Sequence, residues 1–462
     1  MTYRLMLAIP VLLSVAACAV RPPYKTPSVA PSTMRNIDAA QVVEQPFDLR
    51  WWEQFEDPVL DELVTRTLAA NHDVRMAVAR VEQARAVFDD IALDRYPTAI
   101  AGASVDRRDQ AIPGFSDKPR KLTTYQAGFD AFWEVDLFGR IRSQVRAASA
   151  NAESFEAEAD DVRVSVAAEV ARNYFEVRGL QQQLAVAARS VTNQQETLRL
   201  TQVRRDAGIG EEQDVASAAA RVAAIEASIP PIRSAIAQRE HRIAVLTAVR
   251  PGQRGVDLSP RPYPPLTRAL AIGGPDSLLR RRPDIRAAER RLATATAQEG
   301  VAAADLYPRI TLTGFLGLLA GRGNLFNVSD TRAWAVTPAL SWAAFDLGSA
   351  RARLRGVEGV TREALAEFEQ AVLRALEETD NALVNYREDQ QRLVKLTEQA
   401  RESTRAATIA RVRSREGAVD FLALLDAERT ELQAEDAVAQ AEAGVFTSVI
   451  ALYKALGGIP VS

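Results

Sequence analysis

The chain carries one sequence pattern twice, and a repeat of this size constrains the fold more than any single residue does. The first copy occupies residues 57 to 250 and the second residues 268 to 460. Matching positions keep a nearly constant spacing; Asp73 and its counterpart Asp284, for example, lie 211 positions apart. A duplicated chain favours a duplicated structure, and it argues against a site built from one unrepeated set of catalytic residues.

The composition is that of a folded protein without the residues for a metal site. With 462 residues, 47% of them hydrophobic and 25% charged, the chain can bury a large apolar surface. A net charge of -3 with scattered arginines offers no basic surface to a nucleic acid. One cysteine and two histidines cannot build a structural zinc site or a disulfide, so we expect no metal and no cofactor.

The N-terminus resembles a bacterial lipoprotein signal. A short positive start, Met1–Arg4, precedes an apolar run, Leu5–Val15, and two alanines stand directly before Cys18. The apolar run is shorter than the roughly 20 residues of a transmembrane helix, so we expect a cleaved signal peptide over residues 1-17. Cys18 then becomes the first mature residue and carries acyl chains such as palmitate. The alternative is an incidental cysteine in an ordinary secretory leader.

The segment after Cys18 is expected to be extended, and helices follow it. The proline-rich stretch Arg21–Pro31 cannot form a helix. Aromatic residues at Trp51–Phe55 are predicted to hold this segment against the body of the protein. Apolar spacing then predicts one helix from about Leu60 to Asp94.

Each copy is predicted to contain a very long helical hairpin. Apolar residues from Ile141 to Val166 recur in steps of four and three, the spacing of a coiled-coil seam. Since no proline interrupts residues 140 to 206, one helix of 67 residues would span about 100 Å. The turns are expected at Gly208 and Gly417, and the returning helices are predicted to have the N-caps Asp214 and Asp420 and, in the first copy, a kink at Pro230-Pro231.

Two β-hairpins precede these long helices, at residues 97-133 and 309-345. The apolar period changes there from 3.6 to 2, with strand runs of roughly ten residues. This is the length of a tilted strand that crosses a bilayer, and Trp133, Trp334 and Trp342 fall near strand ends, as at membrane interfaces. An ordinary soluble hairpin at the end of a coiled coil is the alternative.

Four membrane strands cannot stand alone. Open strand edges are not tolerated in hydrocarbon, and the smallest closed membrane barrels have about eight strands. One chain therefore has to oligomerise, with eight strands as a dimer or twelve as a trimer.

Three segments resemble one family. They are Trp51–Phe55 with Asp57-Pro58, Arg281–Glu289, and Leu452–Gly458. Together with the duplication, they cover nearly the whole mature chain. The chain resembles the TolC-like outer membrane efflux proteins, the outer membrane factors of tripartite efflux pumps and type I secretion systems. Within this family it is similar to the lipoprotein branch of RND-type efflux systems.

The resemblance implies a mainly α fold with a membrane β-barrel part. Three chains would form a twelve-stranded outer-membrane barrel that continues as an α-helical tunnel through the periplasm. The expected organisation is a signal peptide (1-17), an extended segment (18-56), a first repeat (57-250), an equatorial linker (251-275), a second repeat (276-457) and a C-terminal tail (458-462). The protein would be lipid-anchored in the cell outer membrane and extend into the periplasm.

The resemblance also implies a passive duct that breaks no bond. Its partners would be a homotrimer, a periplasmic adaptor protein, an inner-membrane pump and outer-membrane lipid, and the chain would not be an enzyme. Substrates would enter at the periplasmic tip, where Gly208 and Gly417 turn the chain and the adaptor docks. In the lipoprotein branch a ring of Leu and Asp closes this tip, which makes Leu422 and Asp426 the predicted gate residues. Three carboxylates at a narrow axis repel one another and attract cations.

Other interpretations stay open from the sequence. Asp426 could lie on a solvated face near a helix N-terminus, where Asp is favoured in any case. Arg280–Arg282 is more typical of a solvated or salt-bridged belt than of an anion site. The chain as a whole could be a lipid-anchored coiled-coil scaffold or adaptor without a pore. An enzyme is the third alternative, but His72 and His241 lie on helical stretches without a repeated nucleophile.

Overall fold

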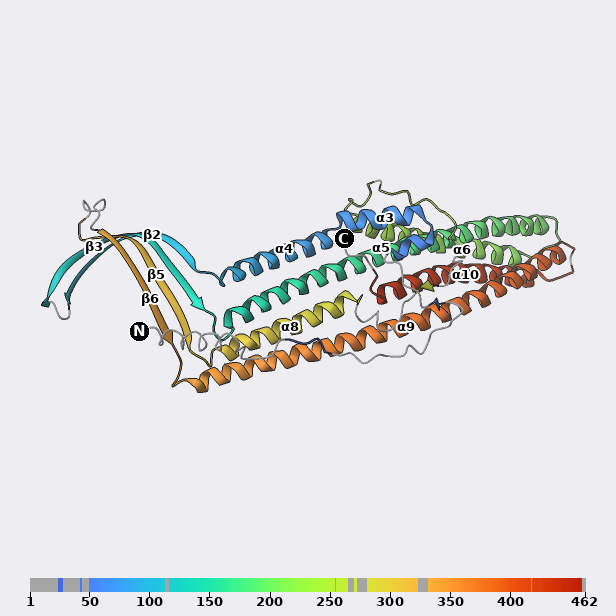
Figure 1. Cartoon of the computed structure of the whole chain (residues 1–462). Coiled ribbons are helices and arrows are strands. Elements are labelled where there is room, and N and C mark those ends of the chain that lie inside the picture. Colours follow the sequence, from blue (N-terminus) through green and yellow to red (C-terminus); the bar gives the residue numbers. More distant parts are fainter. Residues whose placement is uncertain are drawn as a thin grey trace. The chain divides into compact units, whose positions relative to one another are not determined.

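The computed structural model describes most of the chain. The described residues are 24–27, 42–43, 50–112, 116–253, 255–264, 270–271, 281–322, 331–416 and 418–458 (Figure 1). Cys18 and Gly417 lie outside them. Two compact units divide the chain: the first comprises Met1–Ser28, Arg80–Glu156 and Ala287–Gln370, and the second comprises Val29–Ala79, Ala157–Arg286 and Ala371–Ser462.

The helix predicted from Leu60 to Asp94 is two helices, α3 (Pro58–Ala70) and α4 (His72–Leu93), so this prediction is wrong. The break is at Asn71, whose ψ of 135° is not helical. Its side-chain amide donates to the carbonyl oxygen of Leu246 at 2.9 Å, and its amide oxygen accepts from the backbone N–H of Asp73 at 2.8 Å. Asn71 thus caps α4 and ties it to a distant helix.

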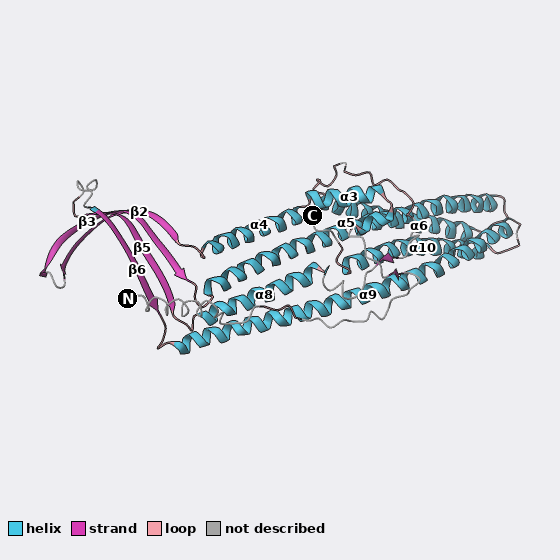
Figure 2. Cartoon of the chain, in the orientation of Figure 1, coloured by secondary structure: helices cyan, strands magenta, loops and turns pink. Residues whose placement is uncertain are grey.

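The predicted long helices are present. The first is α5 (Arg140–Asp206), with the 67 residues expected from the sequence, and it returns as α6 (Glu212–Leu246) (Figure 2). In the second copy α9 (Leu347–Arg415) returns as α10 (Phe421–Ala455). α6 continues as a helix through Pro230 and Pro231. The predicted kink there stays a prediction.

The N-caps of the returning helices differ from those predicted. α6 has its N-cap at Glu211, and Asp214 lies in the first turn of the helix, where its charge meets the positive end of the helix dipole. α10 has its N-cap at Asp420, as predicted, but this side chain makes no capping hydrogen bond.

Four strands form an antiparallel sheet in the first unit, while β1 (Val42–Val43) pairs in parallel with β4 (Leu270–Ala271) in the second. In the described part of the chain the order of the four-stranded sheet is β2 (Thr98–Ile112), β3 (Ser116–Val135), β5 (Arg309–Ala320) and β6 (Arg332–Ser341). The strands of the first hairpin are longer than predicted. β3 pairs with β5 and so joins the two copies, while β2 and β6 form the outer edges.

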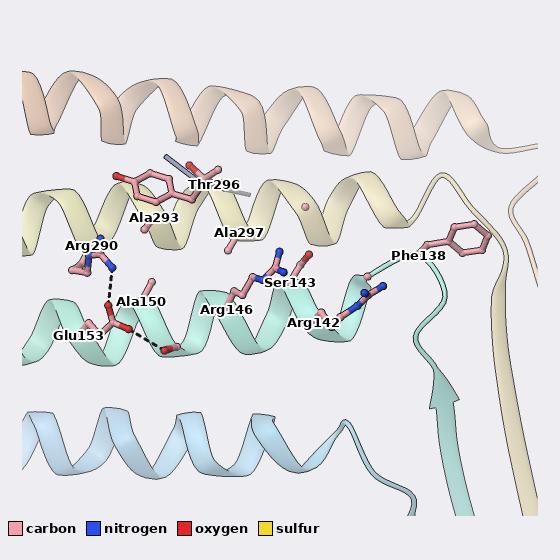
Figure 3. Close-up of a pocket in the computed structure, with 14 residues that line it drawn as sticks. Phe138, Arg142, Ser143, Arg146, Ala150, Glu153, Arg290, Ala293, Thr296 and Ala297 are labelled. Atoms are coloured by element: carbon pink, nitrogen blue, oxygen red, sulfur yellow. Dashed lines mark hydrogen bonds and ion pairs between the residues drawn. The ribbon is translucent and has the colours of Figure 1, made fainter. Parts of the chain in front are cut away.

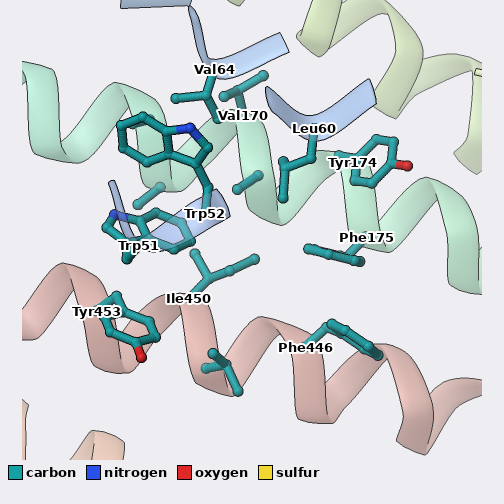
Figure 4. Close-up of a cluster of buried hydrophobic side chains, with 14 of the residues drawn as sticks. Trp51, Trp52, Leu60, Val64, Val170, Tyr174, Phe175, Phe446, Ile450 and Tyr453 are labelled. Carbon is teal, nitrogen blue, oxygen red and sulfur yellow. The ribbon is translucent and has the colours of Figure 1, made fainter. Parts of the chain in front are cut away.

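The core of the second unit holds the N-terminal aromatic residues in place, as predicted. The 3-10 helix η1 (Trp51–Phe55) inserts between α5 and α10 (Figure 4). Trp51 is 1% exposed, stacks on Tyr453 with ring centroids 5.6 Å apart, and donates from Nε1 to the carbonyl oxygen of Gly458 at 3.1 Å. Since these contacts join the segment around Trp51 to Tyr453 and Gly458 near the C-terminus, η1 closes the core.

A chain of buried polar groups continues from this core to the linker. Tyr174 donates to Asp57, which also caps α3. Burial and this hydrogen bond raise the pKa of the Tyr174 hydroxyl, so it stays protonated. Arg178 donates to the Tyr174 oxygen at 2.8 Å and to the Ser259 carbonyl oxygen. The linker after α6 is therefore fixed by side chains of α5.

The arginine run before α8 (Pro283–Ala304) is salt-bridged. Arg282 is 6% exposed and makes ion pairs with Asp284 at 2.8 Å and Glu378 at 2.6 Å. It also donates to the Ala455 carbonyl oxygen at 2.7 Å. Because its donors are already used within the chain, this residue fits the predicted belt and not an anion site; Arg280 lies outside the described residues.

Candidate functional site

The sheet has an apolar face and a mixed face, called the polar face below, which carries Thr98, Asp130, Thr313 and Thr337. Side chains alternate between faces along a strand, so the strand register assigns each residue to a face. The apolar face carries the cross-strand rows Ala99, Ala131, Gly314, Val336 and Ala101, Phe129, Leu316, Trp334. The polar face carries the rows Thr98, Phe132, Thr313, Thr337, then Ile100, Asp130, Phe315, Ala335, then Gly102, Gly128, Gly317, Ala333. This is the alternation of a membrane strand with lipid on one side and water on the other.

Tryptophans mark the same junction in both copies. The indole of Trp133 donates to the Arg95 carbonyl oxygen at 3.1 Å, and that of Trp342 donates to the Leu306 carbonyl oxygen at 3.0 Å. Both acceptors directly precede a Tyr-Pro pair. Trp334 lies on the apolar face and is 77% exposed. Aromatic rings at the ends of an apolar band are typical of a membrane interface.

The turn after α5 is as predicted. Gly208 has a φ of 75°, in the left-handed region, and its N–H donates to the Arg205 carbonyl oxygen at 2.8 Å. A Cβ here would meet nothing within 4 Å, so the backbone angle and not crowding requires glycine. The matching Gly417 lies outside the described residues.

The two predicted gate residues lie on the surface of α10 in this single chain. Leu422 is 49% exposed, and the Asp426 side chain is 63% exposed. They are four residues apart and so share one face of the helix. Asp426 pairs with Arg429 on the same helix. Its charge is therefore neutralised locally, which the sequence prediction did not include.

A buried polar network next to these residues was missed from the sequence. Glu428, with its side chain 3% exposed, accepts from Arg411 at 2.9 Å and from the amide of Gln194. Arg411 also pairs with Glu431. Burial alone would lower the pKa of Arg411, but its hydrogen bonds to the two carboxylates raise it above its usual range. The network joins α5, α9 and α10 near the turns.

A largely apolar groove of about 530 Å³ lies beside this network. Its lining includes Leu200, Phe421 and Leu424, with the exposed side chains of Val203 (53%) and Ile209 (70%). Exposed apolar surface next to a tight turn is typical of a contact surface for another protein. The groove lies at the tip where the sequence predicted docking.

A second groove, of about 250 Å³, lies between α5 and α8 (Figure 3). An ion pair of 2.8 Å joins Glu153 to Arg290 across it. Tyr24 lines it and donates to Glu289 at 2.7 Å, which places the N-terminal segment against α8. Burial alone would raise the pKa of Glu289, but hydrogen bonds from Arg290 and Tyr24 lower it below its usual range.

The two histidines are exposed helical residues, and neither belongs to a metal-binding cluster. Among the residues that the structure describes, no group of His, Cys, Asp and Glu could hold a metal ion. His72 is the first residue of α4, and His241 lies on α6 at the edge of the groove beneath the linker.

Comparisons with known proteins agree with this geometry. The family model "Outer membrane efflux protein" matches the chain twice, over residues 63–249 and 274–458. The chain is 30% identical to the pyoverdine export outer membrane protein OpmQ of Pseudomonas putida over 97% of this chain and 96% of that protein. It is 27% identical to SilC of Salmonella typhimurium, named a probable outer membrane lipoprotein, over 95% of this chain and 94% of that protein.

The fold is that of a solved channel. The structure of the outer-membrane channel OprN superposes with a TM-score of 0.93 at 48% identity and covers 96% of this chain and 99% of that chain. The membrane-type sheet, the duplicated helical hairpins and both matches to the family model lead to the same conclusion. The chain belongs to the outer membrane efflux protein family.

Proposed function

We propose that three copies of this chain close one passive duct from the periplasm to the cell exterior. As an outer membrane efflux protein the chain is a channel component, and its family is not an enzyme family. The observation that carries the proposal is the four-stranded sheet with an apolar face and two open edges, β2 and β6. Open edges cannot face hydrocarbon, so the strands of neighbouring chains have to pair. Three copies supply twelve strands and two supply eight.

The helical part also exposes apolar surface in a single chain. α6 contains an 18-residue window that is apolar enough to cross a membrane, yet only 22% of that window is buried. α6 packs against α5: Arg239 and Arg242 of α6 make ion pairs with Glu176 and Glu169 of α5, respectively. These ion pairs fit a helix that packs against its neighbour in water. Its free apolar surface fits contact with the next copy.

Native mass spectrometry of detergent-extracted protein tests the trimer. We expect a mass of three subunits that persists at low protein concentration. A stable species of two subunits would show that the duct is a dimer with eight strands and not a trimer. Stable single subunits would overturn the duct and favour the lipid-anchored scaffold without a pore.

We infer that a periplasmic adaptor and an inner-membrane pump deliver the substrate to the tip. The apolar groove beside Ile209 and Phe421 supports this, because it offers a docking surface next to the turns. Leu422 and Asp426 of three copies would narrow the duct there. The substrate then diffuses out through a water-filled lumen lined by the polar face of the sheet.

We also infer that Cys18 carries the lipid that anchors the chain. Tyr24 is fixed on α8 through Glu289, and Cys18 stands six positions before Tyr24 in the sequence. An extended chain covers at most about 3.6 Å per residue, so Cys18 lies within about 22 Å of Tyr24. The name of the relative SilC as a probable lipoprotein agrees with this.

Replacing Cys18 should abolish lipidation. We expect the Cys18→Ser variant to take up no labelled palmitate, because the hydroxyl does not replace the thiol in the acylation reaction. The measurement is metabolic labelling followed by purification, with the parent chain as positive control. Labelling that persists in the variant would contradict the lipoprotein anchor.

A further inference from the structure

One acidic side chain in the membrane sheet is left without a countercharge. All four strands pair over the stretch of β2 from Thr98 to Ala103, and the charged residues in these rows are Asp130 and Arg332. Arg332 is on the apolar face, in the row at the end nearer the β5–β6 turn, whereas Asp130 is on the polar face. A charged residue on the lumen face of a membrane barrel stands in water, where it tunes the selectivity of the channel.

Other carboxylates of the polar face are neutralised and Asp130 is not. Glu134 pairs with Arg140 at 2.6 Å, and Asp106 pairs with Arg108 at 2.5 Å. Asp130 is exposed and has no hydrogen-bond or ion-pair partner among the residues described. Closing the duct brings no cation beside it either, since the polar faces of the edge strands carry Thr, Ile and Ala in these rows and the neighbouring Gly102 and Ala333 are uncharged.

The sheet bends around this residue. In the next row of the polar face, a Cβ at Gly128 would lie 2.7 Å from the Gly317 Cα, and a Cβ at Gly317 would lie 2.6 Å from the Gly128 Cα. Real Cβ atoms do not approach so closely, so both positions require glycine. The strands thus converge on the polar face, which makes that face concave. Asp130 projects from the concave side, directly opposite Phe315.

The surroundings of the carboxylate are apolar and accessible. Ile100, its partner on β2, is 65% exposed, and Phe132, two residues further along β3 on the same face, is 52% exposed. An aromatic face attracts a cation, and a carboxylate does so more strongly. This combination favours positively charged ligands that have an apolar body.

We propose that Asp130 and Phe132 form a binding site for organic cations in the β-sheet part of the duct. The proposal rests on the proposed function, because the polar face lines a lumen only in the closed oligomer. Three copies place three carboxylates around one passage. Such rings raise the local concentration of cations and exclude anions.

Thiol labelling of the row that contains Asp130 tests the charge. Cys18 is the single cysteine of the sequence, so Ala335→Cys adds one reporter thiol on the polar face, and the unmodified chain is the blank. We expect a cationic methanethiosulfonate to react faster than an anionic one of similar size. Adding Asp130→Asn should lower the ratio of the two rates roughly tenfold. Adding Asp106→Asn instead changes the net charge equally but should leave the ratio within about twofold. Asp106 lies six residues along β2 from the row of Asp130, roughly 20 Å at about 3.4 Å per residue, and salt screens charges beyond about 10 Å. A ratio that Asp130→Asn does not change would overturn the proposal.

A lipophilic cation tests the ligand class. Tetraphenylphosphonium should protect the Ala335→Cys thiol from labelling, while tetramethylammonium at the same concentration should not. Phe132→Leu should weaken this protection and leave the charge ratio unchanged, since it removes the aromatic face alone. Equal protection by both ions would contradict the contribution of apolar contacts to binding.

A thiol on the other face separates this proposal from the proposed function. Ala131→Cys lies on the apolar face, and in membranes it should react with neither charged reagent. If Ala131→Cys reacts and Ala335→Cys does not, the assignment of the lumen fails and the site fails with it. If the faces behave as expected and the ratio does not respond to Asp130→Asn, the site alone is wrong.

Discussion

Replacing Trp51 by alanine is expected to destabilise the protein by about 3–5 kcal/mol, the cost of removing a buried tryptophan from a packed core. The side chain is 1% exposed, stacks on Tyr453 and donates to the Gly458 carbonyl oxygen. Its removal leaves a cavity between η1 and α10 and an unpaired buried acceptor. Urea unfolding of the detergent-purified protein, followed by far-UV circular dichroism, measures the loss.

Two variants show where this loss comes from. Trp51→Phe keeps an aromatic ring and loses the hydrogen bond, so we expect the free energy of unfolding to fall by about 1–2 kcal/mol. Trp334→Ala makes the same chemical change at a side chain that is 77% exposed on the sheet, and we expect less than about 0.5 kcal/mol. If Trp51→Ala costs no more than Trp334→Ala, the N-terminal segment does not close the core.

Replacing Asp426 by alanine is expected to open the tip. Asp426 neutralises Arg429 on the same helix, so its loss leaves three unpaired guanidinium groups near the axis of the proposed trimer. The charge of Arg429 also acts on a neighbouring helix. The pKa of Arg221 on α6 is lowered, mainly by burial and secondly by repulsion from Arg429. Exposed pairs contribute about 0.2–1 kcal/mol each, so three copies shift the open fraction by roughly 3- to 150-fold.

Conductance across a planar bilayer measures this effect. The parent should be nearly closed, and Asp426→Ala should conduct more. The double variant Asp426→Ala/Arg429→Ala should return toward the closed state, because it removes the repelling charge as well. Glu435→Gln breaks the exposed pair with Arg189 further along α10 and should leave the conductance unchanged. An Asp426→Ala channel as closed as the parent would remove Asp426 from the gate.

Local patterns predicted the long elements well and the contacts between them poorly. The bounds of α5 follow from uninterrupted seam spacing, and Gly208 follows from the need for a left-handed turn. The break at Asn71 could not be predicted, because apolar spacing continues across it and the cause is the Leu246 carbonyl oxygen, 175 positions away. Tertiary contacts override helical periodicity at such points.

The candidate site shows the same division. The family resemblance nominated Leu422 and Asp426, but the pairing of Asp426 with Arg429 changes how its charge acts. Glu428 follows Phe421 and Leu424 in steps of three and four, so it occupies a position where an apolar residue is expected. This mismatch was the available signal for the buried network. Its partner Gln194 is 234 positions away, so the sequence alone could not supply the pair.

The pairing of β3 with β5 has a consequence for how such proteins arose. Within one chain this ladder joins the first copy to the second, and between chains a ladder of β6 with β2 would join the second copy to the first. A closed trimer therefore has six similar junctions between neighbouring β-hairpins, three within chains and three between chains, and approximate sixfold symmetry. A half-length ancestor could have formed the same wall from six subunits. Gene duplication and fusion would then have freed the two halves to diverge.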